Sequence, residues 1–243
     1  MKFKSLSTAI ALSLASTTAF SGSFNAEVTA NYADLDGDAD TIALIGELYF
    51  AQVNTDGHPL EEADFLEKAS NVELAYASTS AGPVDSTLAT LGVNYYIPDT
   101  IFFAGAAIAR ATVEVGSFDD SDTDWGLTAG VTPIEGLLVT TEYFNEPGYD
   151  LNLQAKYVKA LAGETAVNVE ASFQDAEEDN IFGLSADYYF NQKASLGANI
   201  LSADETGYGI QGKLFVTNEF SIGAEYFTVD STNAIFLEAG YRF

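Results

Sequence analysis

The side chains that could carry chemistry in this chain are almost all carboxylates. Its 243 residues include 36 Asp and Glu against 9 Lys and Arg, with one His and no Cys, for a formal net charge of −27. Without Cys there is no disulfide, thiolate zinc site or thiol nucleophile. The sign of the charge also excludes a protein that binds nucleic acid by neutralising phosphates.

The densest group of carboxylates is an acidic run at residues 34–40 that resembles a calcium-binding loop. An EF-hand needs Gly at its sixth position and Glu at its twelfth, but these positions hold Ala39 and Ile45, so that motif is excluded. Two interpretations remain, a weak divalent-ion loop and a solvated acidic loop. The candidate metal ligands are Asp34, Asp36, Asp38 and Asp40.

The single histidine gives little support to an enzyme. His58 lies between Gly57 and Pro59, in a connection rather than in a strand pattern. A serine–histidine hydrolase built into a membrane barrel would need its histidine on a strand, beside the nucleophile. We therefore expect no catalytic residue, no enzyme activity and no cofactor.

Most of the chain alternates between apolar and polar residues with a period of two, which indicates β-strands. From Phe24 to Tyr32, for example, every second residue is apolar and the others are Asn, Glu or Thr. The pattern predicts an all-β protein with about fourteen strands, twelve being the alternative count. The expected strands are 24–33, 41–52, 71–79, 87–97, 101–115, 125–132, 137–146, 149–160, 165–174, 180–190, 194–203, 208–216, 220–229 and 234–243.

The amino terminus has the layout of a secretory signal peptide. Lys2 and Lys4 precede an apolar stretch that ends in small residues. We expect residues 1–21 to be cleaved, which leaves residues 22–243 as one barrel domain. Without the two lysines, seven bases face 36 acids.

The distribution of charge favours a membrane barrel over a soluble sandwich. In this assignment the apolar strand face carries no charged residue, and the polar face carries only thirteen. An open sheet edge in lipid would leave backbone groups unpaired, so the sheet must close into an antiparallel up-and-down barrel. The residues expected to line its lumen are Glu27, Glu47, Glu73, Arg110, Glu114, Glu142, Asp150, Lys156, Glu170, Asp187, Lys213, Glu225 and Glu238.

Aromatic residues form two rows on the apolar face, as expected for the two interfaces of a bilayer. One row comprises Phe50, Tyr95, Phe103, Tyr157, Phe190, Phe220 and Tyr241, and the other comprises Tyr32, Tyr76, Trp125, Tyr143, Phe173, Tyr208 and Tyr226. An even number of strands places both termini in the periplasm. The odd-numbered connections, with seventeen acids and no base, then face the exterior.

The connection at residues 53–70 joins the second and third expected strands. A short helix over residues 59–69 would favour Pro59 in its first turn, Glu61 and Glu62 near its amino end and Lys68 near its carboxyl end. Apolar residues between them would give this helix a buried side. We expect this connection at the periplasmic mouth, where it either narrows the pore or simply caps it.

The carboxyl terminus carries a resemblance to known proteins. The last strand, residues 235–243, ends on Phe243 and is similar to the last strand of bacterial outer-membrane barrels. The segment from Gly57 to Ser70 is similar to one found in a family of small porins of Gram-negative bacteria. The resemblance implies a diffusion pore, a location in the cell outer membrane, and recognition of Tyr241 and Phe243 by the barrel-assembly machinery.

These observations predict a passive porin for small hydrophilic solutes that prefers cations, since acids outnumber bases on both the expected lumen wall and the expected rim. The expected partners are outer-membrane lipid and lipopolysaccharide, the assembly machinery, small solutes and cations, with no nucleic acid. The alternative is a non-conducting barrel with a structural or adhesive role at the cell surface. An extracellular soluble β protein is disfavoured by Phe243 and by the charge-free apolar face.

Overall fold

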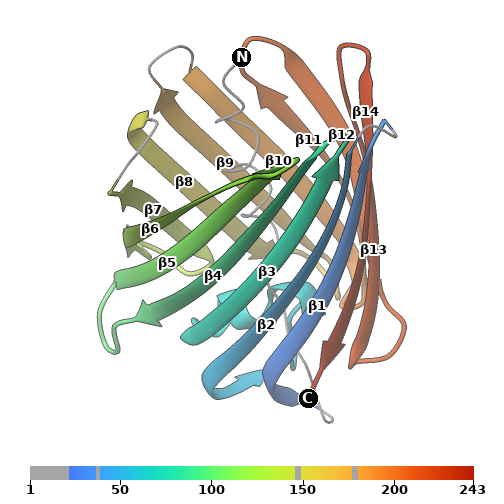
Figure 1. Cartoon of the computed structure of the whole chain (residues 1–243). Helices are drawn as coiled ribbons and strands as arrows, with labels where there is room; N and C mark the ends of the chain where they lie inside the picture. Colours follow the sequence, from blue (N-terminus) through green and yellow to red (C-terminus); the bar gives the residue numbers. More distant parts are fainter. Residues whose placement is uncertain (1–21, 37–38, 146–148, 177–179) are drawn as a thin grey trace.

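The protein is a closed barrel of antiparallel strands, seen from the side in Figure 1. The structure, a computed structural model, describes residues 22–36, 39–145, 149–176 and 180–243. Each strand pairs with its neighbours in sequence, and β1 pairs with β14 to close the barrel. The predicted fold, with fourteen rather than twelve strands, is confirmed. The expected signal peptide, residues 1–21, lies outside the described residues.

The strands are tilted, and most are longer than the sequence pattern predicted. No helix in the described part of the chain is long and apolar enough to cross a membrane. In chain order the strands are β1 (Ser23–Leu35), β2 (Ala39–Asn54), β3 (Asn71–Ala81), β4 (Val84–Tyr96), β5 (Phe102–Val115), β6 (Phe118–Val131), β7 (Leu137–Phe144), β8 (Tyr149–Ala160), β9 (Ala166–Ala176), β10 (Asn180–Asn191), β11 (Ala194–Ser202), β12 (Thr206–Phe215), β13 (Phe220–Val229) and β14 (Thr232–Arg242).

The two ends of the barrel differ in their connections. One end, at the bottom of Figure 1, holds the start of β1, the end of β14 and the connection between β2 and β3; we call it the terminal end. At the opposite end, the hairpin end, β3–β4 and β5–β6 are joined by two-residue turns. Gly82 and Gly116 begin these turns with φ of 59° and 64°, a conformation that glycine adopts without a steric penalty.

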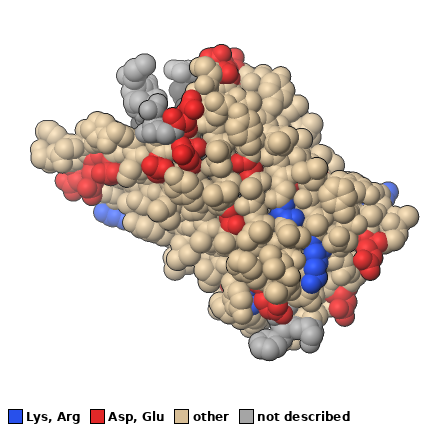
Figure 2. Space-filling view, turned by 90° about the vertical axis from the view of Figure 1, so that its right-hand side faces the viewer, with Lys and Arg blue, Asp and Glu red and all other residues tan. Residues whose placement is uncertain are grey.

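The outward surface of the barrel is apolar, and its exposed residues alternate with inward ones along each strand. Ile42, Leu44 and Leu48 on β2 are more than half exposed, whereas Thr41, Ile45 and Glu47 on the opposite face of this strand are buried. Figure 2 shows one side of the molecule, where wide areas carry no charged residue and most acidic side chains gather toward the ends. This is the surface expected of a barrel immersed in lipid.

Two aromatic residues do not lie on the outward face as predicted. A β-bulge between Phe24 and Ala26 reverses the alternation at the start of β1, so Phe24 points inward and is only 1% exposed. On β5 the outward residue is Phe102, and Phe103 faces inward, where its ring contacts Tyr96 edge-on at 4.8 Å.

The face assignment predicts unequal costs for the same charge on two adjacent residues of β10. Leu184 is outward and 39% exposed, and Ser185 is inward and partly buried. Leu184→Lys should lower the free energy of unfolding in lipid vesicles by about 2–4 kcal/mol, because the ammonium enters hydrocarbon. Ser185→Lys should cost far less, because that position faces the polar lumen. Equal costs in urea titrations of the two variants would contradict the assignment.

Candidate functional site

The connection between β2 and β3 turns into the barrel instead of lying across its mouth. We call residues 55–70 the plug. It contains a 3-10 turn, η1 (Leu60–Glu62), followed by the helical turn α1 (Ala63–Leu66). Leu60, Glu62 and Ala63 are each no more than 3% exposed, which shows that the plug is packed against inward side chains.

The plug reaches the opposite wall. The backbone N–H of Leu60 donates a hydrogen bond to the carbonyl of Gln192, in the turn between β10 and β11, with an N···O distance of 2.7 Å. In the closed order of fourteen strands, β3 and β10 are seven positions apart. The plug therefore spans the lumen at the terminal end.

The local sequence explains how the plug starts and where it packs. Gly57 supplies a positive φ of 81°, and Pro59 has a φ of −53°, which suits the residue before a helical turn. Ala63 packs in a buried cluster with Phe24, Tyr49 and Val53. The bulge that turns Phe24 inward thus supplies part of the apolar surface against which the plug rests.

Two glutamates of the plug form ion pairs with the wall. Glu62 pairs with Lys156 on β8 at 2.8 Å and accepts a hydrogen bond from the Tyr189 hydroxyl at 2.6 Å. Glu61 lies 3.6 Å from the ammonium of Lys213 on β12 and accepts a hydrogen bond from Ser195 at 3.2 Å. These contacts connect the plug to four strands that are distant from it in sequence.

Each of these lysines also pairs with a glutamate on the wall. Lys156 lies 3.1 Å from Glu170 on β9, and Lys213 lies 2.6 Å from Glu238 on β14. The side chains of Lys156 and Lys213 are 31% and 12% exposed, so each ammonium is partly buried and is held between a wall carboxylate and a plug carboxylate.

Arg242, at the end of β14, completes the attachment. Its guanidinium lies 3.6 Å from the carboxylate of Glu27 and donates a hydrogen bond to the carbonyl of Leu60 at 2.9 Å. It also lies over the rings of Phe215 and Phe24, at 4.1 and 5.4 Å from their centroids. Because Arg242 is only 1% exposed, it makes these contacts away from water.

Burial shifts the pKa of carboxyl groups in the plug. Removal from water raises the pKa of Glu62 from 4.5 to about 7, although the neighbouring Lys156 acts in the opposite direction, and Glu61 adds to the rise. Burial also raises the pKa of Asp64, against the opposing effect of Lys156 and Arg242. Both groups therefore hold their protons more tightly when the plug is docked than when it is free in water.

Most of the residues predicted to line the lumen are on inward strand faces. They are Glu27, Glu47, Glu73, Glu142, Lys156, Glu170, Asp187, Lys213, Glu225 and Glu238. The side chain of Asp150 lies outside the described residues. Asp187 and Glu225 are joined through two amides: Gln211 donates to Asp187, and Asn199 donates to both Gln211 and Glu225, each at 2.7 Å.

The prediction was wrong for Arg110 and Glu114. Both share the outward face of β5 with Ile108, which is 49% exposed and pairs with the exposed Trp125. Arg110 donates a hydrogen bond to Ser121 on the same outward face at 2.8 Å. Polar character alone suggested the lumen, but these residues lie near the hairpin end, where the outward surface becomes polar.

Several inward charges were missed by the sequence prediction. Arg242 was assigned to the chain end, although it lies four residues after Glu238 on the last strand and therefore on the same face. The acids Asp120, Asp122 and Asp124 were assigned to an external loop. Because β6 begins at Phe118, they are strand residues in register with Val113, Ala111 and Ala109 on the inward face of β5. Extending the alternation to the ends of these strands would have found all four residues.

The acidic run 34–40 is part of the first hairpin. Asp34 pairs in register with Asp40, whose carboxylate accepts a hydrogen bond from Tyr32. Asp36 occupies the turn with a φ of 55°, and Asp38 lies outside the described residues. In the described part of the chain, no three acidic or histidine side chains are placed to hold a metal ion.

Comparison with known proteins agrees with this geometry. Residues 1–154 match the model of a family described as "Putative general bacterial porin". The chain belongs to this family. The porin is thus a β-barrel channel of the outer membrane of Gram-negative bacteria, as its sequence predicted.

The outer membrane protein Omp33 of Acinetobacter baumannii is a solved structure with the same fold. It is 24% identical to the porin, with a TM-score of 0.75, and the match covers 91% of this chain and 99% of that one. The KdgM porin, at 8% identity, covers 89% of this chain and 99% of its own with a TM-score of 0.48. No curated protein sequence matches the chain.

Removing only the basic partner of the Arg242–Glu27 pair should be costly for the stability of the barrel. Arg242→Met leaves Glu27, which is 2% exposed, without its cationic partner. We expect a loss of about 3–5 kcal/mol in the free energy of unfolding, measured by urea titration in vesicles. The double variant Arg242→Met/Glu27→Gln should recover part of that loss. Arg110→Met, at an exposed outward position, is the control and should change little.

The raised pKa values predict that docking of the plug depends on pH. Because Glu62 and Asp64 bind protons more tightly when docked, docking is most favourable below about pH 4.5 and loses this contribution as the pH rises to about 7. Mean conductance in planar bilayers should therefore be higher at about pH 8 than at about pH 5. Glu62→Gln should weaken the dependence. Glu164→Gln, exposed in the β8–β9 connection at the terminal end, should leave it intact. A conductance that falls with rising pH would contradict this assignment.

Proposed function

We propose that the protein is a diffusion channel for small hydrophilic solutes, with a preference for cations, and that the plug forms its constriction. The membership of the porin family and the closed barrel support a channel. The cation preference rests on one observation, the unequal pairing of acidic and basic groups on the inward wall.

Every base on an inward strand face of the described chain is paired with carboxylates. Lys156, Lys213 and Arg242 all lie at the terminal end, in contact with the plug. Their positive charge is therefore compensated where the plug crosses the lumen.

The acids elsewhere on the inward wall have no such partner. Among the described residues, no ion pair involves Glu73, Asp120, Asp122, Asp124, Glu142, Asp187 or Glu225. These residues come from five strands, so negative charge is distributed over several parts of the wall. A passage lined in this way attracts cations and repels anions.

The plug determines what passes at the terminal end. Its contacts extend from β2 and β3, where it originates, to β8, β10–β12 and β14. Passage of a solute requires the plug to shift or to leave space beside it. The two glutamate–lysine contacts and the Arg242 hydrogen bond then set the free energy of that movement.

Selectivity is tested by the reversal potential in a potassium chloride gradient. We expect a preference for K⁺ over Cl⁻ at about 0.1 M salt, where the screening length is ~10 Å, and a weaker preference at about 1 M, where it is ~3 Å. Neutralising Glu142, Asp187 and Glu225 to amides should reduce the preference. Neutralising Asp34, Asp36 and Asp40 at the hairpin end should reduce it less, because that turn lies farther from the ion path. Anion selectivity at low salt would contradict the proposal, and the absence of conductance would favour the structural or adhesive alternative.

We also propose that Phe243 acts as a signal for the barrel-assembly machinery. It follows the last strand, is 51% exposed, and stacks edge-on with Tyr241 at 5.6 Å. Deleting Phe243 should lower the amount of folded barrel in the outer membrane without reducing synthesis, as measured by the heat-dependent gel shift of membrane fractions. Normal amounts of folded protein would contradict this role.

A further inference from the structure

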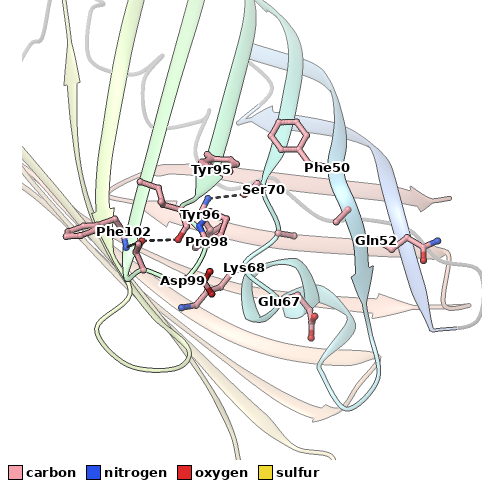
Figure 3. Close-up of a pocket in the computed structure, with 14 residues that line it drawn as sticks. Phe50, Gln52, Glu67, Lys68, Ser70, Tyr95, Tyr96, Pro98, Asp99 and Phe102 are labelled. Atoms are coloured by element: carbon pink, nitrogen blue, oxygen red, sulfur yellow. Dashed lines mark hydrogen bonds between the residues drawn. The ribbon is translucent and has the colours of Figure 1, made fainter.

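The wall of the barrel contains a crevice of about 520 Å³ where the plug returns to β3. It lies between the end of β2, the last plug residues Glu67–Ser70 and the turn between β4 and β5 (Figure 3). The crevice exists because β2 continues to Asn54 whereas β3 begins only at Asn71. Beyond that point the β2–β3 ladder ends.

Ser70 connects the two sides of this gap. Its carbonyl accepts a hydrogen bond from the N–H of Phe50 at 3.0 Å, and its hydroxyl accepts one from the N–H of Tyr96 at 2.9 Å. Ser70 therefore fastens the end of the plug to both β2 and β4, and the crevice lies beside this attachment.

The outer part of the crevice is aromatic. Phe50, Tyr95 and Phe102 are all outward and more than 40% exposed, and the rings of Phe50 and Tyr95 are 6.5 Å apart. They belong to the aromatic row of the terminal end, the level at which a bilayer changes from acyl chains to head groups.

The polar part of the crevice carries both signs of charge. Lys68 and Glu67 come from the plug, and Asp99 comes from the β4–β5 turn, and all three are exposed. An ammonium group is favoured by aromatic faces and by carboxylates, whereas a phosphate is favoured by a lysine. A zwitterion fits this combination better than a purely anionic group does.

We propose that the crevice binds the head group of a membrane phospholipid that carries both a phosphate and an ammonium group. The phosphate faces Lys68, the ammonium lies near Asp99 and the aromatic rings, and the acyl chains follow the outward surface of β2 and β4. The proposal goes beyond the channel function and does not depend on conduction.

Such a lipid would also affect the plug. The ammonium of Lys68 donates to the hydroxyl of Thr132, at the start of the β6–β7 connection, at 2.9 Å. Lys68 therefore connects the plug to the wall on one side and faces the crevice on the other. A phosphate beside it adds a contact that exists only when the plug is docked.

The test is native mass spectrometry of the full barrel in detergent with equal amounts of phosphatidylethanolamine and phosphatidylglycerol. We expect one retained phosphatidylethanolamine and less phosphatidylglycerol. Asp99→Asn removes the charge but tolerates the backbone φ of 58°, and should lower retention about fivefold. Lys68→Met should have a similar effect. Lys159→Met, outward at the same end on β8, should retain the lipid as the unchanged protein does.

Two further ligands separate the lipid from other occupants. Soluble phosphoethanolamine should not displace the lipid at similar concentration, because it lacks acyl chains, and a short peptide with a free amino terminus should not bind. Preferential binding of either would overturn the lipid assignment. Equal retention of both phospholipids, or unchanged retention in Asp99→Asn, would overturn the proposal. Asp99 lies outside the plug, so its result does not depend on the docking of the plug.

Discussion

In the hydrocarbon layer of a membrane, a backbone N–H or C=O without a partner costs several kcal/mol, and this constraint determines the rest of the structure. Pairing of β1 with β14 removes the last unpaired edge. Closure then gives every strand one face in lipid and one in the lumen, and the alternation along each strand follows. The bulge near Phe24 and the early start of β6 each bring further residues onto the inward face, and the barrel still closes.

The polar lumen created by closure contains bases that need carboxylates. Lys156, Lys213 and Arg242 are close to the plug, and each has a wall glutamate in addition to a plug contact. Separating a buried ion pair is costly, so the plug and the charges of the wall stabilise each other. The positive charges are compensated only near the plug. The acids on the rest of the wall therefore produce the electric field that a passing ion meets.

The fold could be predicted from the sequence because its signal is local. The alternation of Val28, Ala30 and Tyr32 with polar residues identifies a strand and its faces without knowledge of its neighbours. The plug could not be predicted in the same way, because the contact of Leu60 with Gln192 joins segments that are distant in sequence. Its acidic and apolar residues suggested a helix but not which wall it would meet.

The errors in the lumen assignment also have a physical origin. Arg110 was placed by its polarity, although its position two residues after Ile108 put it on the outward face. Arg242 was missed because it stands at the chain end, although the same rule puts it beside Glu27 on β1. The backbone determines on which face of a strand each residue lies, whereas the polarity of the outward face varies with depth in the membrane. Register is therefore the better guide near the ends of strands.

A reversible covalent bond between the plug and the opposite wall tests most directly whether the docked plug limits passage through the barrel. The chain has no cysteine, so the double variant Leu60→Cys/Gln192→Cys introduces a single pair. The hydrogen bond between the backbones of these residues brings the two segments close enough for a disulfide. Single-channel conductance in a planar bilayer should be low when the pair is oxidised and should rise on reduction, while the unmodified protein should not respond to the reductant. Equal conductance in the oxidised and reduced states would contradict the account.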